Sequence, residues 1–187
     1  MKRVFFLAIA ATLLLAGCDD SKNPTIDVNA KNVKIEFTAI TENGEGQPQN
    51  STLKSETGST FKVKRIVDID EISTDEIAEY LERIKDVTVD NSQLEITLDP
   101  PGNFSVTNLI ISATGIQDEL KIPSYTIGGE FQPPANILAF STALFFKLLF
   151  DRSLEVTVEG ETDAPTGTTV NITYKNDLVL SVKVLKD

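Results

Sequence analysis

The chain contains one cysteine, Cys18, and its position makes it the first candidate for chemistry. A cysteine sulfur can act as a nucleophile, bind a metal, oxidise or carry an acyl group. The 187-residue chain has no second cysteine, which excludes an intramolecular disulfide, and no histidine, which removes the commonest zinc ligand. Residues 4 to 15 are apolar except for Thr12, so only Ala16 and Gly17 separate Cys18 from an apolar segment that would be unfavourable in water. This position argues against an ordinary buried or redox-active cysteine.

The residues before Cys18 have the organisation of an export signal. Lys2 and Arg3 form a basic head, the apolar run follows, and small residues come just before the cysteine. Such a segment is removed from the mature protein. The run has about a dozen residues, whereas crossing a membrane needs roughly 20. We therefore expect residues 1–17 to be a signal peptide, with an ordinary secretory signal or an uncleaved anchor as the alternatives.

The sequence Leu15-Ala16-Gly17-Cys18 resembles the lipobox of bacterial lipoproteins. The resemblance covers only the export segment. It implies cleavage before Cys18, acylation of its sulfur and of the new amino terminus with palmitate-like chains, and anchoring in a membrane leaflet. Each buried methylene contributes about 0.8 kcal/mol, so several chains would hold the protein firmly. We expect no cofactor other than this covalent lipid.

The residues after Cys18 are polar, and we expect 18–31 to be the acylated cysteine and a flexible tether with a reach of roughly 20 Å. The pair Asp19-Asp20 resembles the export signal of surface lipoproteins in the Bacteroidota. In enterobacteria, an aspartate at that position resembles an inner-membrane retention signal instead. The pair therefore gives opposite answers in different hosts. We expect a membrane-anchored lipoprotein of the bacterial cell envelope and favour the outer membrane over the inner one, which stays the alternative.

The composition limits what the rest of the chain can do. The net charge is −11, from 28 acidic and 17 basic side chains, and this argues against binding nucleic acid. Without histidine, the chain lacks the commonest general base and the serine-protease type of triad. Carboxylate pairs could hydrolyse a glycosidic bond, but no spacing selects a pair. We expect no catalytic residues and no enzymatic activity.

Acidic residues cluster at 68 to 79 and raise the question of calcium binding. If Asp68 begins a calcium loop, Asp70 and Glu79 fall at its third and twelfth positions, as an EF-hand requires. Ile72 then occupies a ligand position, and Ser73 replaces the glycine of the sharp turn. Ser73 and Glu76 instead have the spacing of a helix capping box. We therefore expect no metal site, and Asp68, Asp70 and Glu79 are only weak candidates.

Alternating polar and apolar residues predict strands over most of the chain. The capping box predicts an amphipathic helix over about 74 to 85. A turn at 99–102 predicts that residues 104–113 return as the antiparallel partner of 94–98, with a bulge at Asn108-Leu109. The remaining expected features are strands at 31–40, 60–67 and 116–122, a loop at 123–134, and three closing strands around 154–158, 170–174 and 180–184, with a turn at 175–177.

Residues 135–150 are apolar on nearly every side and rich in phenylalanine. They are too few to cross a bilayer, so they predict a buried helix, with Ser141, Thr142 and Lys147 facing water. An alternative is that this helix lines an apolar pocket or touches the membrane interface. The candidate contact residues for an apolar ligand or partner are Phe140, Phe145, Phe146 and Phe150.

Together these patterns predict an α+β domain at 32–187, mainly antiparallel β. We expect a two-sheet β-sandwich of about eight strands, with one amphipathic helix and one mostly buried apolar helix. In overall pattern it resembles the small β-sandwich lipoproteins of unknown function in Bacteroidota envelopes. The expected function is a membrane-anchored, non-enzymatic binding or scaffolding module for an envelope protein or glycan. The alternative is a carrier or sensor of an apolar ligand that uses the helix at 135–150.

Overall fold

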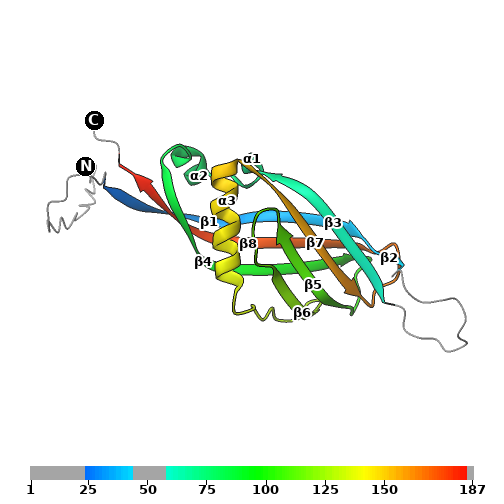
Figure 1. Cartoon of the computed structure of the whole chain (residues 1–187). Coiled ribbons are helices and arrows are strands. Elements are labelled where there is room, and N and C mark those ends of the chain that lie inside the picture. The colour runs from blue at the N-terminus through cyan, green and yellow to red at the C-terminus, as the bar shows by residue number, and fades with distance from the viewer. Residues whose placement is uncertain (1–23, 44–57, 185–187) are drawn as a thin grey trace, which may run out of the picture.

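The computed structural model describes residues 24–43 and 58–184, and Cys18 lies outside them. The described residues form a mainly antiparallel β-sandwich of eight strands, with a three-stranded sheet, a five-stranded sheet and three short helices (Figure 1). The expected fold class is confirmed.

The three-stranded sheet has the order β1-β8-β4, and all its strands are long: β1 is Thr25–Ile40, β8 is Thr169–Lys183 and β4 is Ile84–Asp99. Every second residue of β8 is buried, from Val170 to Val182, because side chains alternate between the two faces of a strand. The other face carries polar residues. The sheet therefore has one face toward the core and one toward water.

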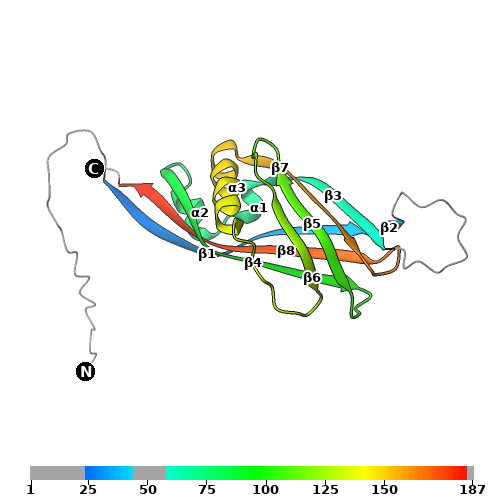
Figure 2. The same ribbon diagram turned by 60° about the horizontal axis from the view of Figure 1, so that its bottom comes forward.

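The five-stranded sheet has the order β2-β3-β7-β5-β6. Its strands are β2 (Glu42–Asn43), β3 (Ser59–Asp68), β7 (Ser153–Thr162), β5 (Ser105–Ala113) and β6 (Leu120–Thr126). It covers only one part of the inner face of the longer sheet, and the helices cover another part (Figure 2). The core runs continuously beneath both covers.

Two short helices, α1 (Ile69–Ile72) and α2 (Asp75–Tyr80), replace the single helix expected at 74–85. The side chain of Thr74, not Ser73, caps α2 by accepting a hydrogen bond from the Ile77 amide at 3.4 Å. The expected capping box of Ser73 and Glu76 is therefore wrong: the N-cap is one residue later, and the apolar Ile77 three residues on cannot complete a box. The apolar stripe is correct at Ile77, which is fully buried, but Ile84 already belongs to β4.

The expected turn at 175–177 is wrong, because β8 runs through it without interruption. Asn176 points inward, and its Oδ1 accepts a hydrogen bond from Ser92 Oγ at 2.6 Å. Asp177 Oδ1 accepts one from the Asn32 amide at 3.0 Å, where β1 has a bulge. These contacts satisfy polar residues inside a long strand. Since β1 starts at Thr25, residues 25–31 belong to the sheet and not to the expected tether.

The turn after β4 does not make a hairpin, and this expectation is also wrong. β4 pairs with β8, while β5 crosses to the other sheet and pairs with β6 and β7. The expected bulge is confirmed, since the register between β5 and β7 shifts between Thr107 and Ile110 and Asn108 has φ +50°. β6 begins later than expected and occupies part of the expected loop at 123–134.

The third helix, α3 (Ile137–Asp151), confirms the helix expected at 135–150. It runs across the strands of the longer sheet, beside the five-stranded sheet (Figure 1). Within the described ranges, no helix is long and apolar enough to cross a membrane.

Candidate binding site on helix α3

Helix α3 has one buried apolar face and one exposed apolar face. The buried face includes Phe140, Leu144, Phe145 and Leu148, each at most 2% exposed. The exposed face carries a row of residues at four-residue spacing: Leu138, Thr142, Phe146 and Phe150. Of these, Leu138, Phe146 and Phe150 are 43%, 44% and 47% exposed. A helix buried on one side therefore leaves large apolar side chains in water on the other.

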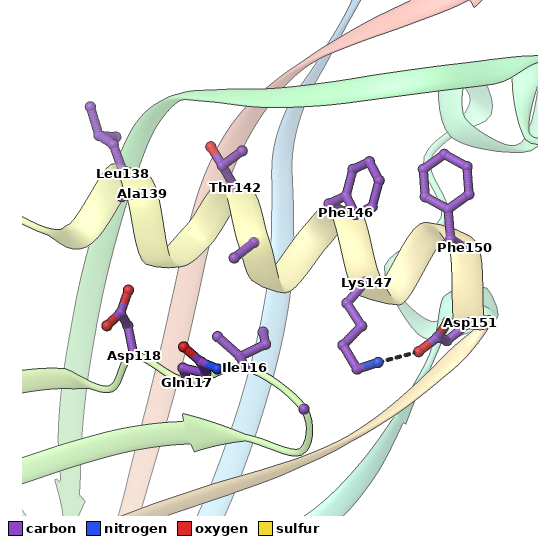
Figure 3. Close-up of a pocket in the computed structure, with 12 residues that line it drawn as sticks. Ile116, Gln117, Asp118, Leu138, Ala139, Thr142, Phe146, Lys147, Phe150 and Asp151 are labelled. Carbon is purple, nitrogen blue, oxygen red and sulfur yellow. Dashed lines mark hydrogen bonds and ion pairs between the residues drawn. The ribbon is translucent and has the colours of Figure 1, made fainter.

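The exposed face is one side of an open groove of about 810 Å³. Its other side is the loop between β5 and β6, and the small residues Ala139 and Ala143 lie between. Figure 3 shows Ile116, Gln117 and Asp118 on the loop, facing α3. The volume is within the usual range of ligand pockets, roughly 300–1,000 Å³. We name this set of residues, 115–118 with the exposed face of α3, the α3 groove.

The two ends of the α3 groove differ in charge. Near the carboxyl end of the helix, Lys147 Nζ lies 2.6 Å from Asp151 Oδ2 (Figure 3). The Lys147 side chain also lies over Gly115, where an added Cβ would come within 2.9 Å of its Cε. Near the amino end is Asp118, which has no ion pair within the described part of the chain. The groove thus has an unpaired carboxylate at one end and a lysine at the other.

A buried polar network fixes α3 on the longer sheet. Ser141 Oγ is hydrogen-bonded to Tyr174 OH, to Ser92 Oγ at 2.8 Å and to the Ile137 carbonyl at 2.6 Å. Thr142 Oγ1 accepts a hydrogen bond from the Val89 amide at 3.1 Å. Burial raises the pKa of Tyr174, although its hydrogen bonds to the two serines oppose this. The network therefore holds in place the helix that forms one side of the groove. It also contradicts the expectation that Ser141 faces water.

The four phenylalanines expected to contact a ligand or partner separate into two pairs. Phe140 and Phe145 are 2% and 0% exposed and belong to the core, so they are wrong as contact residues. Phe146 and Phe150 both line the groove, with ring centroids 4.6 Å apart. The apolar sequence alone could not distinguish these pairs, because periodicity cannot orient a helix that is apolar on all sides.

Sequence reasoning missed the rest of the groove. Leu138, Ala139 and Ala143 lie on the expected helix, and the spacing of Leu138, Phe146 and Phe150 in multiples of four indicates a shared face without saying which way it points. Ile116 and Asp118 come from a loop that had been expected to lie in a strand. No pattern in the sequence connects this loop to α3.

The weak calcium candidates do not converge on a common site. Asp68 ends β3, Asp70 is in α1 and Glu79 is in α2. Glu79 is hydrogen-bonded to Tyr80 and raises the pKa of that phenol. Across 24–43 and 58–184, no group of three or more acidic residues is arranged to hold a metal ion. Helix starts and surface contacts account for these carboxylates.

No protein-family model matches the chain, and no curated protein matches it. Among solved structures, a chain of Desmodium yellow mottle tymovirus is similar over 100% of this chain and 99% of its own. The sequence identity is 12% and the TM-score is 0.29.

Proposed function

We propose that this protein is a lipid-anchored module of the bacterial cell envelope that binds a partner through the α3 groove, without enzymatic activity. The observation that carries the proposal is the exposure of Leu138, Phe146 and Phe150 along one groove. Large contiguous patches of exposed apolar side chains are uncommon on monomeric proteins and mark interaction sites. Burying it against a partner would contribute roughly 25 cal/mol per Å² of apolar surface.

The shape of the site favours a macromolecular partner over a carried small molecule. A carrier needs a cavity that encloses most of its ligand. Here the aromatic rings stand at the surface, and the groove is open along the helix (Figure 3). The second candidate, a carrier or sensor of an apolar ligand, is supported by the volume of about 810 Å³. Saturable binding of a fluorescent fatty acid by the detergent-free protein would favour that candidate.

The lipid anchor rests on the lipobox-like sequence that ends at Cys18. From Cys18 to Pro24, where the described chain begins, there are six Cα–Cα steps, which span at most about 20 Å. An acylated Cys18 would therefore hold the Thr25 end of the domain next to the bilayer. Cys18→Ala should abolish palmitate incorporation and release the protein from membranes. Continued labelling and membrane association of this variant would contradict the anchor.

Binding through α3 is testable with a photo-reactive amino acid in place of Phe146 in intact cells. We expect irradiation to give a discrete cross-linked species. Ile66 is the matched control position, because it is 63% exposed but lies on β3 and does not line the groove. Equal cross-linking from both positions would indicate random collisions and contradict a specific site. Phe150→Ser should reduce cross-linking from position 146, since Phe150 packs on Phe146.

A further inference from the structure

From the pattern of residues on α3, we propose that the partner in the α3 groove is a second copy of this chain, packed with its helix antiparallel. The exposed face is self-complementary about its midpoint. Its carboxyl half carries the bulky pair Phe146 and Phe150, and its amino half carries Leu138 with the smaller Ala139, Thr142 and Ala143. Antiparallel pairing places the bulky half of each copy on the small half of the other. Ridges on one helix then fill grooves on its partner.

A two-fold axis through the middle of this face defines the register. Leu138 of each copy lies opposite Phe150 of the other, and Thr142 lies opposite Phe146. Every contact is made twice, as a closed isologous dimer requires. Both rings are about half exposed in the single chain. In the pair, Thr142 of the other copy would cover Phe146, and Leu138 of the other copy would pack on Phe150.

The charges of the groove fit the same arrangement. In the antiparallel pair, the amino end of one groove faces the carboxyl end of the other. Since Asp118 and Lys147 lie toward opposite ends of the groove (Figure 3), Asp118 of each copy would then lie near Lys147 of the other. Asp118 has no ion pair within the described residues, while Lys147 has only Asp151, on its own helix. The pairing would bring a cation to the unpaired carboxylate at both ends, and a parallel pairing would not.

The location of the anchor supports the same axis, and this step rests on the proposed function. Helix α3 crosses the strands of the longer sheet, and the Thr25 end of β1 is at one end of those strands (Figures 1 and 2). A two-fold axis perpendicular to α3 in the plane of the contact runs along the strands. It therefore puts both Thr25 ends at the same end of the dimer. Two lipids at Cys18 could then enter one leaflet.

Cysteine cross-linking of the full-length protein in native membranes tests this dimer. Ala143→Cys lies near the axis, and a short bismaleimide should link two copies into a species of twice the mass. Leu138→Cys in one tagged copy should link to Phe150→Cys in a differently tagged copy. Two Leu138→Cys copies should not link, because twelve residues of helix separate them by about 18 Å. Ile66→Cys is the control for collisions between exposed thiols.

Disruption of the groove gives the second measurement. Phe146→Glu should weaken association by about thirty-fold or more in Kd, since a central aromatic anchor contributes at least about 2 kcal/mol and 1.4 kcal/mol is tenfold. Ala143→Arg, which fills the small half, should act in the same direction. Thermal unfolding checks that each variant is folded, and both positions face solvent or the groove rather than the core.

Several outcomes would overturn the dimer: cross-linking no stronger than from Ile66→Cys, Leu138→Cys pairs that link to each other, or a cross-linked species that contains a different protein. Failure of the anchor is read separately. In the parent chain Cys18 is the single cysteine. Maleimide labelling of Cys18 would contradict acylation of its sulfur, whereas the thiols at 138, 143 and 150 report on the dimer.

Discussion

The hydroxyl groups of Ser141 and Tyr174 are hydrogen-bonded to each other between α3 and the longer sheet. Tyr174 is 1% exposed and Ser141 is fully buried. The pair joins the amino-terminal half of the helix to β8, the central strand of the sheet. A buried hydroxyl without a partner costs free energy, so each of the two groups stabilises the position of the other. This contact fixes which face of α3 points outward.

Tyr174→Phe tests that contact and its pH dependence. Near neutral pH the variant should lose about 1 kcal/mol of unfolding free energy, the usual net value of a hydrogen bond. Burial raises the pKa of Tyr174 above its ordinary value of about 10. The tyrosine therefore stabilises the fold fully below pH 10, and this stabilisation is lost as the pH rises above 10. The difference between wild type and variant should shrink at alkaline pH, as measured by urea unfolding.

The other tyrosines, Tyr80 and Tyr125, are present in both proteins and cancel in the comparison. Ser141 remains bonded to Ser92 and to the Ile137 carbonyl, so the variant should fold. A difference in unfolding free energy that stays constant from pH 8 to pH 11 would contradict the assigned role of Tyr174.

Ser92 and Asn176 provide a second prediction, from the same network. Asn176 Oδ1 accepts the Ser92 hydroxyl at 2.6 Å, and Asn176 Nδ2 is buried without a partner. Ser92→Ala would leave the Asn176 side chain with no hydrogen bond, at a cost of about 1–3 kcal/mol. The double variant Ser92→Ala with Asn176→Leu replaces both polar groups and should recover most of this loss. Equilibrium unfolding of the two single variants and the double variant measures the coupling between the two positions. If the losses of unfolding free energy in the single variants simply add in the double variant, the prediction is wrong.

Long-range contacts of this kind explain why the turn at 175–177 and the hairpin after β4, both expected from the sequence, are absent from the structure. The residues 175–177 have the composition of a turn, yet the strand continues because tertiary hydrogen bonds satisfy Asn176 and Asp177. Alternation of apolar residues predicted the strands and the sandwich, since it depends only on local geometry. Which strands pair across the sheets depends on long-range contacts. The turn after β4 therefore suggested a hairpin that does not exist.

The α3 groove, too, depends on long-range contacts that the sequence pattern does not reveal. The sequence identified an apolar helix and four phenylalanines, of which Phe146 and Phe150 line the groove. The orientation of the helix depends on Ser141, a polar residue expected in water and found in the core. Ile116 and Asp118 join the site only through the crossing of β5 to the other sheet. These relationships require knowledge of the packing.

Gly160 supplies a third prediction. It lies opposite Phe61 across β7 and β3, and an added Cβ would come within 2.7 Å of the Phe61 Cζ. Gly160→Ala should therefore destabilise the protein by about 1–3 kcal/mol through overpacking. Gly58→Ala is the matched control, because its nearest contact would be an ordinary 3.5 Å to the Thr162 carbonyl. Phe61→Leu combined with Gly160→Ala should relieve the clash, whereas equal losses at 58 and 160 would contradict it.

Glu95 and Lys175 lie on the water-facing side of the longer sheet and give a prediction at acid pH. Lys175 Nζ lies 2.5 Å from Glu95 Oε2, and its hydrogen bond and charge lower the pKa of Glu95. A lowered folded pKa stabilises the protein above the unfolded pKa of about 4.3, and the effect is lost as the pH falls through the folded value. Since the Glu95 side chain is 54% exposed, the pair should contribute less than about 1 kcal/mol.

Glu95→Gln should therefore lower the unfolding free energy slightly at pH 7. Near pH 2 it should leave this free energy equal to wild type, because the protonated glutamate of the wild type and the glutamine of the variant are both uncharged. High salt should also reduce the difference at pH 7, because ions screen an exposed pair. Glu130→Gln is the control, since it removes a negative charge from the loop after β6 without removing any ion pair found in the described part of the chain. If Glu95→Gln were as destabilising at pH 2 as at pH 7, the loss would come from packing of the side chain and not from its charge.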